Sequence, residues 1–374
     1  MRQTEAVLTR RALGRVTVPL LLTLIATSVG LVPARAASAK PAATTRVTAI
    51  TIPVVRTTVQ RLRFEADHVA LYWSGHPDAA VTVAFSRDGV HFGRTLDVGR
   101  DEVGEQRANG VTYGAVLTAN RAAFVRVTTN RALSHLTVLG LADRVRALVD
   151  KLLPNSPVGG AHPAQPPIVA RSGWGADESL RFNSNGSEKW PPAFAPVQKL
   201  IVHHTAGANN DRNPAATIRA IYYYHAVTQG WGDIGYNFLI DEAGRIYKGR
   251  DSHAKGSTAD TITGEDASGN GVTGAHAHEY NSGTVGVALL GTLTNQDATP
   301  AAKRALEDLL AWKADTHGID PHGSSRYTNP VGGNQKVFAN IAGHRDVGTT
   351  ACPGGAFYAG LPEVRDQVAA RMGK

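Results

Sequence analysis

The chain is poor in cysteine, methionine and aromatic residues. Its 374 residues include one cysteine and two methionines, and aromatic residues make up 6%. A single cysteine excludes an internal disulfide, so a disulfide-held fold is ruled out. The sequence has no internal repeat and no basic run interleaved with aromatics, which argues against nucleic acid as a partner. A hydrophobic content of 42% and a charged content of 19% are typical of a folded protein.

The long apolar run of the sequence lies near its N-terminus, at Val16–Val32, after an arginine-rich start and before the small-x-small sequence Ala34–Arg35–Ala36. This pattern predicts a signal peptide over residues 1–36, and we expect a secreted or cell-wall protein with no stable membrane anchor. The alternative is an uncleaved anchor, and the export route, general or twin-arginine, stays open. The predicted signal carries five arginines and one glutamate, so the rest of the chain keeps +4 of the +8 net charge. A mild positive excess suits an anionic wall or membrane surface.

Composition and sequence pattern divide residues 37–374 into four segments. Residues 37–50 are rich in Ala, Thr, Lys and Pro and predict a linker. Residues 51–142 contain several short runs of β-formers and predict a small, sandwich-like all-β domain. Its scattered histidines, His68, His76 and His91, are expected to be solvated turn residues. Residues 143–167 predict a helix followed by a Pro-rich linker. From 168 to 374 strand and helix patterns alternate, which predicts an α/β or α+β domain with helices packed on a sheet. Strands are expected at 199–203 and 284–290, and a hairpin at 236–248. Helices are expected to start at Asn213–Pro214 and Thr299–Pro300, and long loops are expected at 252–274 and 322–336.

The stretch Gly343–Gly354 holds the most specific chemistry, because His344 and the only cysteine, Cys352, stand eight residues apart in a loop rich in glycine. Imidazole and thiolate are two of the three protein ligands that a catalytic zinc needs. The pair His203–His204, which ends an apolar run, is the candidate for the third. A surface histidine and an inert buried thiol are the alternatives for these residues taken singly.

Five motifs together carry a likeness to a known family: Ile168–Ala176 (IVARSGWGA), Val202–Ala206 (VHHTA), Gly230–Ile240 (GWGDIGYNFLI), Gly274–His276 (GAH) and Gly343–Gly354 (GHRDVGTTACPG). In this order they resemble the peptidoglycan recognition proteins and the zinc-dependent N-acetylmuramoyl-L-alanine amidases. The resemblance covers residues 168–374 and implies a mixed central β-sheet flanked by helices, with a groove over a zinc ion. The β region bears a weaker likeness to accessory domains of exported actinobacterial amidases.

The resemblance implies that His203, His344 and Cys352 hold the zinc ion. His203 is preferred to His204 because it directly follows the apolar strand and because neighbouring strand residues face opposite ways. Zinc in such a site leaves a fourth position for water and lowers the pKa of that water to about 7. The family places an oxyanion-stabilising tyrosine at Tyr236. Thr350 stands where phage members carry a lysine, as in the amidase-active recognition proteins.

The family's substrate groove corresponds to four positions in this chain: Thr205, His225, His276 and Asn281. The expected partner is peptidoglycan, and we expect a monomer. The stretches 252–273 and 322–335 are longer than in compact members of the family. The dipeptide with which the family distinguishes diaminopimelate from lysine in the stem peptide lies before Gly274 and is not matched in this chain. Stem specificity therefore stays open.

Two functions compete. The first is an exported zinc amidase that cleaves the bond between the lactyl group of N-acetylmuramic acid and L-alanine. The second is a recognition protein that binds muropeptide without cleaving it, although such members typically lack the cysteine ligand that Cys352 provides. A cysteine hydrolase using Cys352 and His344 is a third reading. Because the matched residues follow the Pro-rich linker, we expect a fragment starting near Pro167 to fold and to cleave a small substrate.

Overall fold

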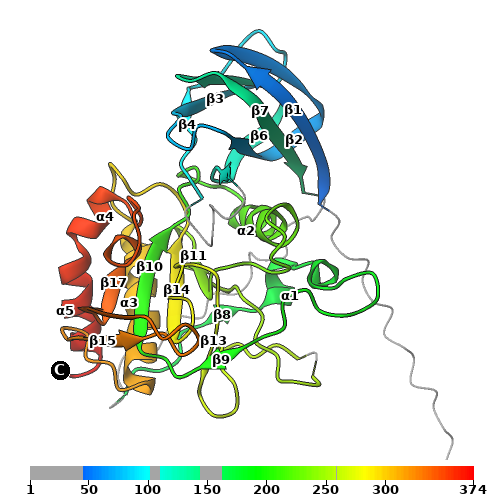
Figure 1. Ribbon diagram of the computed structural model, residues 1–374. Helices are drawn as coiled ribbons and strands as arrows, with labels where there is room; N and C mark the ends of the chain where they lie inside the picture. Colours follow the sequence, from blue (N-terminus) through cyan, green and yellow to red (C-terminus); the bar gives the residue numbers. More distant parts are fainter. Residues whose placement is uncertain (1–44, 102–109, 144–161, 258) are drawn as a thin grey trace, which may run out of the picture. The chain divides into compact units, whose positions relative to one another are not determined.

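The computed structural model describes residues 45–101, 110–143, 162–257 and 259–374 (Figure 1). The predicted signal peptide and most of the helix predicted near residues 142–153 lie outside these ranges. The described residues belong to one compact unit. No helix in the described part of the chain is both long and apolar enough to cross a membrane.

The N-terminal sheet is antiparallel and has seven strands in the order β1-β7-β2-β6-β3-β4, with β5 paired to β2. The alternating burial along β1, β2 and β6 points one set of side chains into a shared core that includes Val69, Trp73 and Val125. This confirms the all-β prediction. Its strands are β1 (Arg46–Val54), β2 (Thr57–Ser74), β3 (Val81–Ser86), β4 (Leu96–Asp97), β5 (Val111–Tyr113), β6 (Leu117–Thr129) and β7 (Leu133–Ala142). Because β1 begins at Arg46, it starts inside the stretch 37–50 that composition predicted as a linker.

A six-stranded mixed sheet forms the centre of the C-terminal region, in the order β17-β10-β14-β11-β12-β8. Strands β10, β14, β11 and β17 pair in parallel, and β12 returns antiparallel to β11 as the predicted hairpin. The strands are β8 (Ile168–Val169), β10 (Lys199–His204), β11 (Phe238–Ile240), β12 (Ile246–Lys248), β14 (Thr284–Leu289) and β17 (Ile341–Gly343). Two small sheets flank it: β9 (Phe194–Ala195) with β13 (Gly271–Val272), and β15 (Ser324–Thr328) with β16 (Gln335–Ala339).

Helices cover both faces of this sheet. Helices α3 and α5 pack on one face, where Leu200 and Val202 of β10 meet Leu306 and Val364. Helix α2 packs on the other face against Leu239 and Ala288. The helices are α1 (Arg171–Trp174), α2 (Pro214–Tyr223), α3 (Pro300–Thr316), α4 (Gly355–Ala359) and α5 (Leu361–Arg371), with a π-helical turn η3 (Tyr224–Thr228) and single 3-10 turns η2 (Glu178–Arg181) and η4 (His344–Asp346).

The predicted helix starts are borne out by their caps. The Asn213 side chain accepts a hydrogen bond from the N–H of Ala216, and Thr299 accepts one from Ala302. Proline follows each cap at the first helical position, where its missing N–H costs nothing. The predicted central sheet flanked by helices is confirmed.

The stretch 322–336 differs from the long loop expected there, because β15 and β16 form a hairpin. Contacts with the buried Lys199 explain the position of this hairpin. The Lys199 ammonium donates to Ser325 O, Phe338 O and Asn340 Oδ1 at 2.7–2.8 Å, all of them in or beside the hairpin. Only Tyr327 and Phe338 are buried in these two strands, so the sequence shows no hydrophobic alternation from which the hairpin could be predicted.

Candidate metal site

Sheet register brings the first two predicted ligands together. His203 stands near the carboxyl end of β10, and His344 directly follows β17. These strands are parallel neighbours in which Val202 pairs with Gly343, so the next residue of each lies at the same edge of the sheet. The two imidazole rings are 4.6 Å apart between centroids.

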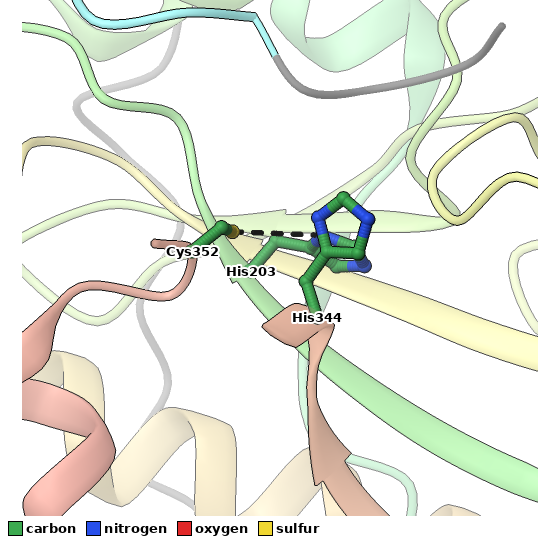
Figure 2. Close-up of side chains that lie close together, drawn as sticks. All are labelled: His203, His344 and Cys352. Carbon is green, nitrogen blue, oxygen red and sulfur yellow. Dashed lines mark hydrogen bonds between the residues drawn. The ribbon is translucent and has the colours of Figure 1, made fainter. Parts of the chain in front are cut away.

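Hydrogen bonds in the loop after η4 bring the third predicted ligand, Cys352, to the two histidines. After η4 the chain folds back, so that the N–H of Arg345 donates to Cys352 O at 3.0 Å. The N–H of Cys352 donates to Thr350 Oγ1 at 2.8 Å, and the N–H of His204 donates to Cys352 Sγ at 3.3 Å. The ligand atoms of His203, His344 and Cys352 then lie within 4.8 Å of one another, and all three side chains are buried. Figure 2 shows them converging, with Cys352 Sγ 3.8 Å from His203 Nδ1.

Hydrogen bonds behind the site fix the tautomer of His203. The hydroxyl of Thr284 donates to Tyr280 O at 2.6 Å, so it accepts from Nε2–H of His276 at 3.2 Å. The other nitrogen of His276, Nδ1, is then an acceptor, and Nε2–H of His203 donates to it at 3.1 Å. His203 Nδ1 is left with its lone pair toward Cys352 Sγ, the arrangement that a metal-binding histidine needs.

The electrostatics agree with a set of neutral imidazoles. Burial, followed by the neighbouring His344, lowers the pKa of His203 well below its usual range. Burial lowers the pKa of His344 to about 4 and that of His276 to about 3. His344 Nδ1 is buried and has no hydrogen-bond partner among the described residues. An unpartnered buried polar atom is costly unless something binds it, so the donor set fits a zinc ion held by two nitrogens and one sulfur.

Tyr236 lies beside these residues. Its ring centroid is 5.6 Å from that of His203, and it is 2% exposed. It helps to line a pocket of about 10 Å³, room for roughly one water molecule. The lining residues are Arg100, Asp101, His204, Thr205, Tyr236, His344 and Cys352.

The other predicted site residues are distributed around this pocket. Thr205 lines it and accepts from the N–H of Gly291 at 3.0 Å. Thr350 lies in the cysteine loop and holds the backbone of Cys352. His276 is fully buried behind His203, and Asn281 Oδ1 accepts from the N–H groups of His276 and Ala277 at 2.7 Å. His225 is 1% exposed, on η3, with its ring 5.8 Å from that of Tyr236. Their roles toward a substrate stay predictions.

A buried ion network explains why the motifs around residues 171 and 233 occur together. Asp233 is fully buried between two arginines, accepting from Arg171 at 3.0 Å and from Arg250 at 2.7 Å. Trp174 Nε1–H donates to Lys248 O at 2.8 Å. These contacts tie α1 and β12 to the segment that leads into Tyr236, so they position the site without lining it.

Comparison with known proteins fits this geometry. A family model described as N-acetylmuramoyl-L-alanine amidase matches residues 193–355. Peptidoglycan-recognition protein SC2 of Drosophila simulans is 33% identical over 191 residues, which span 50% of this chain and 80% of that protein. The chain belongs to the peptidoglycan recognition protein family. This confirms the resemblance drawn from the motifs.

Two further proteins match about half of this chain. An N-acetylmuramoyl-L-alanine amidase of Sus scrofa is 32% identical over 197 residues, 52% of this chain and 26% of the pig protein. The solved structure of Drosophila PGRP-LB is 26% identical and covers 52% of this chain and 92% of that one, with a TM-score of 0.37.

Sequence reasoning missed the contribution of the N-terminal sheet. Arg100 and Asp101 reach the pocket from the segment after β4, yet no motif marks them. His68, expected to be a solvated turn histidine, is 3% exposed and lies 2.8 Å from Thr217 Oγ1 of α2. That expectation was wrong because β2 continues through His68 and packs against α2. His76 and His91 are exposed as expected.

Proposed function

We propose that the chain is an exported zinc-dependent N-acetylmuramoyl-L-alanine amidase. It hydrolyses the amide between the lactyl group of N-acetylmuramic acid and L-alanine in peptidoglycan. The observation that carries the proposal is the buried cluster of His203, His344 and Cys352 beside Tyr236. The amidases among its relatives, such as that of Sus scrofa, support the same activity.

The donor set supports zinc as the cofactor. His203 Nδ1, a nitrogen of His344 and Cys352 Sγ would hold the ion, since lone pairs of neutral imidazoles and a thiolate are ligands that zinc prefers. When bound, zinc supplies a Lewis acid that polarises an amide carbonyl and lowers the pKa of water.

The protein's own groups hold the geometry of the reaction. Tyr236 is placed at the pocket, where its hydroxyl donates to the oxygen that becomes negative as the amide carbon turns tetrahedral. His276 keeps the His203 ring in one orientation, and Thr350 keeps the cysteine loop closed. The groove residues Thr205, His225 and Asn281 are proposed to bind or to shape the site for the muropeptide.

The test is digestion of purified peptidoglycan followed by mass spectrometry of the fragments. The protein should release free L-alanine amino termini, lose this activity with a chelator and regain it with zinc. Elemental analysis should find about one zinc per chain, a stoichiometry that Cys352→Ser or His344→Ala largely abolishes because one of three protein ligands is lost.

Two results would overturn parts of the proposal. Activity that survives complete zinc removal would favour Cys352 as a nucleophile. Binding to peptidoglycan without any cleavage by the zinc-loaded protein would leave a recognition protein in place of an enzyme.

A further inference from the structure

The N-terminal sheet contributes a carboxylate to the wall of the metal site. Asp101 is 8% exposed and lines the same pocket as His344, Cys352 and Tyr236. Its backbone is held firmly, since its N–H donates to Tyr113 O at 3.0 Å and the N–H of Ala115 donates to Gly99 O at 2.7 Å. At Gly99 the segment passes so close to the loop after β10 that an added Cβ would lie 2.9 Å from Cβ of Ala206.

Asp101 is hydrogen-bonded to the buried His225, and a backbone hydrogen bond determines the tautomer of this histidine. The N–H of Gly235 donates to His225 Nδ1 at 3.1 Å, so this nitrogen carries the lone pair. The other nitrogen therefore carries the proton, and His225 Nε2–H donates to Asp101 Oδ2 at 3.0 Å. Gln229 donates to the same oxygen at 2.7 Å. The carboxylate thus holds both ends of the π-helical turn that bears His225.

The chain of contacts ends at Tyr236. Gly235, whose N–H is hydrogen-bonded to His225, is the residue directly before Tyr236. The His225 ring also lies 4.7 Å from the Trp231 ring and 5.8 Å from the Tyr236 ring. A shift of His225 would therefore reach Tyr236 by two routes, through the Gly235 backbone and through ring packing. π-helical turns occur often at functional sites.

We propose that Asp101, supplied by the N-terminal sheet, is a positioning residue for the reaction: it fixes His225, and His225 fixes Tyr236 at the pocket. This inference rests on the proposed function and adds to it a residue from outside the region that resembles the family. It makes the N-terminal sheet a working part of the site. Asp101 acts as a hydrogen-bond acceptor, so its geometry matters more than its charge.

The kinetic test uses the full-length, zinc-loaded protein and a small soluble muropeptide. Asp101→Ala should lower kcat by up to about 100-fold, the scale of a 1 Å misplacement at a reacting centre, while KM and zinc content change little. Asp101→Asn keeps an acceptor oxygen and should restore kcat to within about three-fold of wild type. Asp97→Ala, an exposed aspartate of β4, is the matched control and should have no effect.

A double-variant cycle separates positioning from other roles. In a Tyr236→Phe background, Asp101→Ala should lower kcat by less than about three-fold, because residues that act through one another are not additive. Fully additive losses, or a change in KM alone, would overturn the proposal. Failure of Asp101→Asn to restore kcat would overturn the acceptor role.

A structural measurement keeps the inference testable if the protein proves not to be an amidase. Fluorotyrosine NMR of the full-length protein, with the Tyr236 resonance assigned by Tyr236→Phe, should show that resonance moving in Asp101→Ala and not in Asp97→Ala. An inactive wild type with this movement would overturn the proposed function and leave the positioning contact standing. An unmoved Tyr236 resonance would refute the positioning contact.

Discussion

Zinc affinity should depend on His276, although His276 is not a ligand. His203 Nε2–H donates to His276 Nδ1 at 3.1 Å, inside a site where both residues are fully buried. His276→Phe keeps a planar ring, somewhat larger than imidazole, but removes the acceptor, so the N–H of His203 loses its partner. Partners of this kind typically contribute 10–100-fold to metal affinity, about 1.4–2.7 kcal/mol. We expect zinc to bind His276→Phe more weakly by that factor.

Gly286 offers a second perturbation of the same contact. A Cβ added there would lie 2.3 Å from Cγ and 2.6 Å from Nδ1 of His276, well inside van der Waals contact. Gly286→Ala therefore has to displace the His276 ring without deleting it. Its zinc affinity should fall in the same direction as that of His276→Phe.

The assay is competition with a chelator of known zinc affinity at one fixed pH, since protons compete for the same nitrogens. Circular dichroism checks that each variant is folded. His322→Ala is the control, because the His322 side chain is exposed and its imidazole contacts Asp366, away from the metal site. A zinc dissociation constant within two-fold of wild type in folded His276→Phe would refute the reasoning.

Three further outcomes follow from the structure. Tyr236→Phe should lose roughly 2.7–4 kcal/mol of transition-state stabilisation in kcat with its zinc content intact, which steady-state kinetics and elemental analysis measure together. Burial raises the pKa of Asp233, but the charges of Arg171 and Arg250 outweigh burial and bring the pKa to about 2. The ionised carboxylate should therefore stabilise the fold by about 2–3 kcal/mol relative to Asp233→Asn. Urea titrations should find this difference above pH 4 and should find that it vanishes as the pH falls toward 2. A fragment starting at Pro167 should unfold at lower urea concentration than the full chain, and equal stability would show that the two sheets fold independently.

The candidate ligands could be predicted from the sequence because each stands in a local pattern. His203 ends an apolar run, and His344 and Cys352 share one short loop, so the residues alone gave the candidates and the family resemblance chose His203 over His204. Strand and helix patterns likewise predicted β10, β14, α2 and α3, whose caps and apolar spacing are local. The fold class followed from the same signals.

The contacts that the sequence did not reveal join distant segments through polar groups. Asp101 and His225 are separated by 124 residues, and neither belongs to a pattern that names the other. Lys199 begins a buried strand, where a lysine is not expected, because four acceptors around the β15–β16 hairpin satisfy its ammonium. Hydrophobic periodicity carries no information on such pairings, since they depend on which surfaces meet after folding.

Helix α2 shows why the two regions act as one. A helix on a sheet surface normally keeps a solvated face, but the residues Pro214–Tyr222 are all buried. One side packs on the six-stranded sheet, and the other meets the N-terminal sheet, where Arg219 pairs with Asp143 and Tyr224 donates to Leu71 O at 3.0 Å. Removing the N-terminal sheet would expose apolar α2 and strip Arg219 of a buried partner, a loss of roughly 3–5 kcal/mol when a buried pair is broken. The expectation that residues 168–374 work alone stays a prediction, and these contacts argue against it. The turn that bears His225 follows directly from α2, so losing the sheet that packs on this helix should disturb that turn as well.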